Sequence, residues 1–193
     1  MNFLAHLYLS CDNEDLLIGN MIADFIRNKE VATYSGEVQK GIQLHRQIDS
    51  YTDNHPTVRQ GTHRLQPVHH KYSPVVIDVL YDYLLVKNWD RYSGQTLSSF
   101  TKYVYEILER RMDDMPLKLQ KQLPGMIEGD WLTAYGTISG LSFVFDKMEK
   151  RAKFSARFSD APKSLLMDYE AYNEEFNQFF PEVIEFVNEH CGC

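Results

Sequence analysis

Apolar residues recur at helical spacing along almost the whole chain, and this feature constrains the fold most strongly. Leu16, Leu17, Met21 and Ile22 form one such stripe, because residues three or four positions apart lie on the same face of a helix. No stretch alternates between apolar and polar residues for long enough to predict a β-strand. We therefore expect an all-α protein. Further helical stripes occur at residues 3–8, 38–53, 56–65, 73–89, 97–111, 117–126, 131–150 and 171–188.

The length of 193 residues is enough for one sizeable hydrophobic core. Hydrophobic residues make up 44% of the chain and charged residues 24%, which is ordinary for a soluble globular domain. No internal repeat, low-complexity tract or long linker divides the sequence. Residues 1–193 are therefore expected to form a single compact helical domain.

The net charge of -7 argues against a nucleic-acid partner, because proteins that bind nucleic acids present a basic surface. The apolar N-terminal segment is too short to span a membrane and lacks the positive flank of a signal peptide. The three cysteines, Cys11, Cys191 and Cys193, show no disulfide framework, which suits a reducing compartment. These features predict a cytoplasmic protein. The role of Cys191 and Cys193 and the oligomeric state stay open.

Residues 41–56 carry the densest set of chemically useful side chains. His45 and Asp49 are four positions apart, so they lie on the same helix face, and imidazole with carboxylate is a ligand set for zinc, manganese or iron. Arg46 points to a neighbouring face, where a guanidinium can hold a phosphate through two hydrogen bonds. Asp53 adds another carboxylate one turn further along. The competing interpretation is a surface histidine beside an aspartate, with no metal.

Polar residues also interrupt other apolar helices. Asp24 lies where an unpaired carboxylate is costly, so we expect either a cation or a salt bridge to Arg27. Asp78 and Asp82 repel each other at a spacing of four, which predicts a compensating metal or arginine. The alternative is that one of these two bonds a neighbouring helix while the other is exposed. His6 interrupts an apolar stripe, where a core histidine is commoner than a ligand.

Helices of one small bundle can bring such groups together, as in carboxylate–histidine metal centres. Oxygen and imidazole donors suit manganese, iron or magnesium better than a thiolate zinc site. The predicted ligands are His6, Asp24, His45, Asp49 and Asp82.

Other chemistry is absent from the sequence. There is no Gly-x-Ser-x-Gly elbow, P-loop, dinucleotide fingerprint or Cys-x-x-Cys pair. The absence of these motifs argues against the usual serine hydrolases, nucleotide-binding proteins and hydride-transferring enzymes. The pair His69–His70 precedes Lys71 in a loop-like stretch, so we expect it at the surface.

The motifs at residues 1–7, 19–25, 41–49, 52–56 and 78–82, with those around Trp131 and Gly140, cover nearly the whole chain. In order and spacing they resemble acyl carrier protein phosphodiesterases, also called acyl carrier protein hydrolases. That family is regarded as a diverged relative of the HD-domain phosphohydrolases, so the resemblance implies an all-α, HD-domain-like fold. Its members remove the phosphopantetheine arm from holo acyl carrier protein, using a divalent metal that is usually manganese. The chain departs from the family at Tyr83, where members often have histidine.

The resemblance implies a role for each candidate. A metal held by Asp24, His45 and Asp82, with His6 or Asp49 assisting, would activate a water. Magnesium or iron are the alternatives to manganese. The residues implied in catalysis are Asp24, Arg46, Asp49 and Asp53, with Asp49 or Asp53 accepting a proton and Arg46 stabilising the phosphate.

Acyl carrier proteins are acidic, so the resemblance implies docking on positive side chains. A solvated face is the competing interpretation of the basic segment that begins at Lys147. Two other functions compete: hydrolysis of a nucleotide or small phosphate ester, and a non-catalytic helical binding module with buried salt bridges. The candidate docking residues are Arg59, Arg64, Lys71, Lys147, Lys150 and Arg151.

Overall fold

The structure is a computed structural model that describes residues 1–152 and 157–191. Every regular element within these residues is a helix, which confirms the predicted all-α fold. The α-helices are α1 Phe3–Tyr8, α2 Glu14–Ile22, α3 Gly36–Asn54, α4 Pro56–His69, α5 Ser73–Lys87, α6 Trp89–Tyr92, α7 Leu97–Arg110, α8 Leu117–Glu128, α9 Trp131–Ala134, α10 Ile138–Glu149, α11 Ala161–Met167 and α12 Tyr169–Cys191. Short 3₁₀ helices lie between them: η1 Ala23–Phe25, η2 Asn28–Thr33, η3 His70–Tyr72, η4 Met112–Asp114 and η5 Phe158–Asp160.

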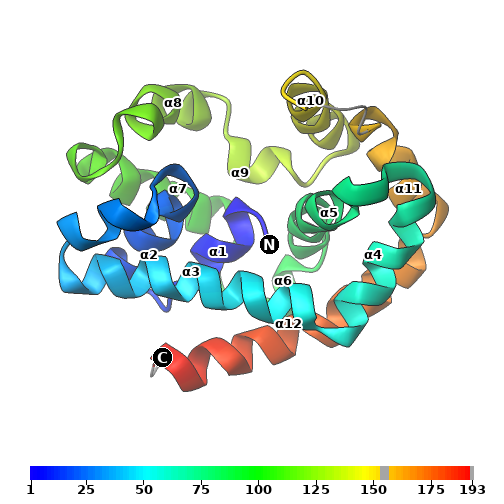
Figure 1. Cartoon of the computed structure of the whole chain (residues 1–193), viewed down its shortest axis with the longest axis horizontal. Coiled ribbons are helices and arrows are strands. Elements are labelled where there is room, and N and C mark those ends of the chain that lie inside the picture. Colours follow the sequence, from blue (N-terminus) through cyan, green and yellow to red (C-terminus); the bar gives the residue numbers. More distant parts are fainter. Residues whose placement is uncertain (153–156, 192–193) are drawn as a thin grey trace.

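Helices α2 and α3 pack backbone against backbone, because a glycine faces a glycine where they cross. A Cβ added to Gly19 would lie 2.6 Å from the Cα of Gly41, and one added to Gly41 would lie 2.8 Å from the Cα of Gly19. Real Cβ atoms do not approach backbone so closely. The pair of glycines therefore sets the short distance between α2 and α3, which run side by side in Figure 1.

Helix α5 lies inside the molecule and is buried on most of its sides. Its apolar residues Val76, Leu80, Leu84 and Leu85 are fully enclosed, as an apolar helix without a polar face requires. Asp82 is an acidic residue among these buried apolar residues, and none of its surface is exposed. Its two oxygens accept hydrogen bonds from the backbone N–H groups of the first turn of α1. The carboxylate of Asp82 therefore anchors the start of α1. Helices α1 and α5 are neighbours in the fold (Figure 1).

The long helix α12 closes the core on another side. Phe176, Phe179 and Phe180 are fully buried, and α12 packs against α3, α4 and α5. Pro181 lies inside α12 and does not end it. Apolar side chains from all parts of the described chain join one continuous cluster, so these residues form a single helical domain. The HD-like arrangement of the helices stays a prediction.

One predicted helix is wrong. Residues 131–150 do not form one helix, because the chain turns at Gly136, and Thr137 then caps α10 by accepting a hydrogen bond from the backbone N–H of Gly140. In the described ranges, none of the helices combines the length and apolar character that crossing a bilayer requires.

Candidate metal centre

Two histidines and two aspartates converge where α1, α3 and η1 meet. His6 Nε2 lies 3.1 Å from Asp49 Oδ1, and His45 Nε2 lies 3.2 Å from Asp49 Oδ2 and 3.3 Å from Asp24 Oδ1. The two imidazole rings stack with their centroids 3.9 Å apart. One ligand atom each of His6, His45 and Asp49 can be chosen so that all lie within 4.8 Å of one another, which is close enough to hold one metal ion.

The site is buried on its imidazole side and open on its carboxylate side. The side chains of His6 and His45 are 3% and 7% exposed, whereas those of Asp49 and Asp24 are 39% and 66% exposed. Asp24 lies in η1, directly after α2, and not inside a continuous apolar helix as its sequence context suggested. The predicted salt bridge from Asp24 to Arg27 is also wrong, because Arg27 pairs with Glu30. A substrate can therefore approach from the side of Asp24.

Asn20 determines where the protons lie on both imidazoles. The Ser10 hydroxyl donates to the carbonyl oxygen of His6, so its oxygen is free to accept a hydrogen bond from Asn20 Nδ2 at 2.9 Å. This turns Asn20 Oδ1 towards His6 Nδ1, 3.2 Å away. The main-chain carbonyl oxygen of Asn20 lies 3.0 Å from His45 Nδ1. Carbonyl oxygens only accept hydrogen bonds, so both Nδ1 atoms carry the hydrogen.

It follows that a neutral imidazole at either position presents the lone pair of Nε2 to the carboxylates. A lone pair opposite a carboxylate oxygen is repulsive unless a proton or a cation lies between them. Burial by itself lowers the pKa of His45, but the hydrogen bonds that its protonated Nε2 donates to Asp24 and Asp49 outweigh this effect and raise the pKa to about 9. Burial lowers the pKa of His6 to about 4. Without a metal, a proton on His45 Nε2 therefore joins His45 to Asp24 and Asp49.

The pKa values of the aspartates move in the complementary direction. A hydrogen bond from His45 lowers the pKa of Asp24 below its ordinary value. Burial raises the pKa of Asp49, but the hydrogen bond from His45 and the nearby α-ammonium of Met1 act in the opposite direction, and this pKa lies far below its ordinary value. Both carboxylates are therefore ionised at neutral pH and available as anionic ligands.

Asp82 lies apart from this cluster, and the structure does not bring it together with the other four predicted ligands. Its oxygens lie 2.9 Å and 3.1 Å from the backbone nitrogens of Leu4 and Ala5, so Asp82 caps α1. Asp78 pairs with the α-ammonium of Met1 at 3.1 Å. The positive groups expected beside Asp78 and Asp82 are thus backbone N–H dipoles and a terminal amine, not a metal or an arginine.

Arg46 and Asp53 lie on α3 beside the cluster. Arg46 is exposed one residue after His45, and it makes no hydrogen bond or ion pair with any residue in the described part of the chain. Asp53 is exposed one turn beyond Asp49, and the structure gives its carboxylate no contact with the cluster. The guanidinium of Arg46 is therefore available to an anionic ligand.

Residues 1–183 match the family model described as acyl carrier protein phosphodiesterase. The chain belongs to the acyl carrier protein phosphodiesterase family. Curated relatives with this name include proteins from Photorhabdus laumondii, 30% identical over 96% of this chain and 94% of the relative, and Pectobacterium atrosepticum, 30% identical over 97% of each. A relative of the same name from Escherichia coli O6:H1 is 31% identical over 96% of each chain. No solved structure matches the chain significantly.

The departure from the usual acyl carrier protein phosphodiesterase pattern at Tyr83 does not fall in the cluster. Tyr83 lies on α5, its ring meets that of Tyr169 edge-on at 6.5 Å, and the Lys87 ammonium lies 5.1 Å from its centroid. Tyr83 therefore packs between α5 and α12, and it is not one of the four converging side chains.

The cations that were predicted to bind a partner protein differ in their contacts within the chain. Arg64 is already engaged, because both oxygens of Glu175 accept from it at 2.8 Å. Arg59 donates to Asn54 Oδ1 and to the carbonyl oxygen of Asp53. Lys71 lies over the ring of Tyr72. The remaining three, Lys147, Lys150 and Arg151, lie on or directly after α10, which packs against α5, α9 and α11.

Sequence reasoning overlooked Asn20, Ser10 and the α-ammonium of Met1. Asn20 is 2% exposed in a run of buried apolar residues, and a buried amide in such a run is the signal that could have identified it. The expectation for His69 is wrong, since this residue is fully buried at the end of α4 with Nε2 3.0 Å from Ser164 Oγ. The hydrogen bonds of Asn20 and of His69 both join residues that are distant in the sequence.

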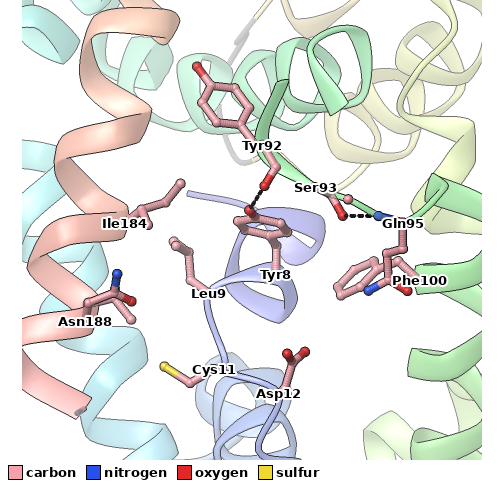
Figure 2. Close-up of a pocket in the computed structure, with 12 residues that line it drawn as sticks. Tyr8, Leu9, Cys11, Asp12, Tyr92, Ser93, Gln95, Phe100, Ile184 and Asn188 are labelled. Atoms are coloured by element: carbon pink, nitrogen blue, oxygen red, sulfur yellow. Dashed lines mark hydrogen bonds between the residues drawn. The ribbon is translucent and has the colours of Figure 1, made fainter. Parts of the chain in front are cut away.

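A cavity of about 370 Å³ lies elsewhere, between the α1–α2 loop, the α6–α7 loop and α12. Figure 2 shows Tyr8 at its centre, with the Tyr8 hydroxyl donating to the carbonyl oxygen of Tyr92 at 2.5 Å, and Ile184 and Asn188 on α12 at its side. None of the predicted site residues lines it. Its lining lacks the paired titratable groups of the cluster, so the cluster is the stronger candidate for chemistry.

Proposed function

We propose that this protein hydrolyses the phosphodiester between a serine of acyl carrier protein and 4′-phosphopantetheine. The products would be the apo carrier protein, with its serine hydroxyl restored, and free 4′-phosphopantetheine. Membership of the family over residues 1–183 supports the substrate. The observation that carries the chemistry is the convergence of Asp24, His45 and Asp49 with His6 at one solvent-accessible point.

The proposal includes a divalent metal at this point, manganese first, with magnesium or iron as alternatives. The donor set fits such an ion, because with both imidazoles neutral two Nε2 lone pairs and two ionised carboxylates face one another, and one cation relieves their mutual repulsion at every contact. His6, His45, Asp49 and Asp24 would hold the metal. When bound, it would supply a Lewis acid and a water of lowered pKa.

The remaining polar residues have distinct proposed roles. Arg46 would bind the non-bridging oxygens of the phosphate, since its guanidinium is exposed beside the cluster and has no competing acid. Asp24 offers one oxygen to His45 and its side chain is largely exposed, so its other oxygen would accept a proton from the attacking water. Asp53 is the alternative proton acceptor. Asp49, with both oxygens on histidines, would act as a ligand.

The test is cleavage of holo acyl carrier protein by purified protein, followed by mass measurement of the carrier protein. We expect conversion to the apo form with manganese, and loss of conversion on chelation. Asp24→Ala should lose at least about a thousandfold in kcat, because it removes a ligand and a proton acceptor together. Asp90→Ala, at an exposed acidic position on α6, is the matched control and should behave like the unmodified protein.

Other outcomes would contradict the proposal in distinguishable ways. Full activity of a well-folded Asp24→Ala protein would refute the role of Asp24. Cleavage of nucleotides or small phosphate esters without cleavage of holo carrier protein would change the substrate. A protein that binds no divalent ion at all would support the non-catalytic binding module, in which the cluster is only a set of ion pairs.

A further inference from the structure

Electrostatic repulsion opposes the binding of an acidic partner, because the chain itself carries a net charge of -7. Favourable docking therefore needs a local group of cations whose charge is not already neutralised. Most arginines at the described surface do not qualify, since an acidic side chain of the same molecule pairs with each of them. These are Arg27, Arg64, Arg110, Arg111 and Arg157.

Lys118 is a cation near the residue that follows Asp24, and it has no acidic partner within the described residues. It lies in the first turn of α8, and its ammonium is 5.6 Å from the centroid of the Phe25 ring. Phe25 directly follows Asp24 in η1. Lys118 therefore places a positive charge beside the ring of the residue that directly follows Asp24 in the chain.

Apolar surface accompanies this charge. Leu117, next to Lys118, is 72% exposed, which is unusual for a leucine at the first position of a helix that packs on the core. The ring of Phe25 stacks on that of Phe3 with 6.3 Å between centroids, so it is held in place and partly accessible. Lys121 is exposed one turn after Leu117. We name Phe25, Leu117, Lys118 and Lys121 the α8 patch.

We propose that the α8 patch is the docking surface for an acidic face of acyl carrier protein, so that the phosphodiester of the bound carrier reaches the cluster through the side of Asp24. This inference rests on the proposed function. Two exposed lysines supply the complementary charge, and Leu117 with Phe25 supplies the apolar contact that a helix needs to bind in a fixed orientation. Arg46 would meet the phosphate itself.

The α8 patch fits this partner better than the predicted patch on α10. Phe143 on α10 is 53% exposed and Lys147 lies over its ring at 5.1 Å, so a similar combination of charge and apolar surface occurs there. Helix α10, however, packs against α5, α9 and α11, whereas Lys118 contacts the residue next to a proposed metal ligand. Proximity to the reacting bond therefore favours α8.

The experiment compares two substrates: holo acyl carrier protein and the small diester bis(p-nitrophenyl) phosphate. We expect Lys118→Glu to raise KM for the carrier protein about tenfold while kcat and the small-diester rate stay unchanged, since reversing an exposed charge at an interface changes association more than chemistry. Leu117→Ser should have the same selective effect. Added salt should raise KM for the unmodified protein and have little effect on the Lys118→Glu variant.

Two control variants make the result specific. Lys102→Glu reverses an exposed lysine on α7 and should leave both substrates unaffected. Lys147→Glu tests α10. If Lys118→Glu and Leu117→Ser cleave holo carrier protein with unchanged KM, or if only Lys147→Glu raises it, the α8 patch is refuted while the proposed function stands. If the unmodified protein neither binds nor cleaves holo carrier protein, the proposed function fails and the docking inference fails with it.

Discussion

At the scale of single residues, Asn20 explains how two imidazoles come to direct Nε2 at carboxylates. Its side-chain oxygen and its main-chain oxygen each accept a hydrogen bond from one imidazole. The spacing of His45 and Asp49 predicted their shared helix face from the sequence alone. The function of Asn20 could not be predicted, because it depends on a hydroxyl and a ring contributed by α1 and the loop after it.

We expect Asn20→Ala to weaken divalent-metal affinity about 10- to 100-fold, because His6 loses the acceptor that fixes its orientation. Calorimetric titration of metal into the protein measures this loss. Nitrogen-15 NMR of the metal-free protein should show His6 shifting from the tautomer with hydrogen on Nδ1 to a mixture.

Asn20→Asp is the matched variant, because it keeps an acceptor for His6 and should recover most of the affinity. Loss of stability alone would leave the tautomer of the folded fraction unchanged. An Asn20→Ala protein that has both the original affinity and the original tautomer would contradict the role of Asn20.

At the scale of elements, the site depends on how closely α2 approaches α3. His45 reaches the carbonyl oxygen of Asn20 across this contact, where Gly19 and Gly41 replace side chains with backbone. The apolar period of the sequence predicted both helices. It did not predict their separation, because two glycines many residues apart reveal a crossing point only once the helices are in place.

Gly41→Ala should destabilise the protein by about 2–4 kcal/mol, since its Cβ would meet backbone atoms that cannot move aside. Urea denaturation measures the change. Gly36→Ala is the control: nothing lies within 4 Å of an added Cβ there, so this change in the same helix should be neutral or stabilise by about 0.5–1 kcal/mol. Equal stability of the two variants would show that α2 and α3 can separate at no cost.

At the scale of the whole molecule, composition and period predicted the helical class, and two charged residues show where such reasoning ends. Asp82 was predicted as a metal ligand, and the structure shows it bonded to backbone groups 77 and 78 positions away along the chain. Arg64 was predicted as a docking residue, and the structure shows it paired with Glu175, 111 positions away. A local pattern can say that a charge needs a partner, but only the folded chain decides which partner it has.

Global stability should depend on pH through His45. Its pKa rises from an ordinary 6.5 to about 9 on folding, so the folded state holds this proton more tightly than the unfolded state does. The resulting stabilisation is fully present below pH 6.5 and is lost as pH rises through 9, by at most about 3 kcal/mol. The α-ammonium of Met1, with its pKa raised to about 10, adds a loss of the same sign above pH 8.

Urea denaturation of chelator-treated protein at several pH values between 6 and 9 checks this dependence. His45→Gln should flatten the slope within this window. A metal-free protein that becomes more stable from pH 6.5 to 9 would show that the cluster is not held by a proton on His45.

The two imidazoles of the cluster differ in how they can be altered by mutation. His6 relies on an amide that a single codon change deletes, whereas His45 relies on a peptide carbonyl that every amino acid at position 20 would still provide. Substitutions at position 20 therefore change the hydrogen bonding of His6 and leave that of His45 unchanged. Random variation or laboratory engineering at position 20 should therefore lower the metal affinity by different amounts and should rarely abolish metal binding.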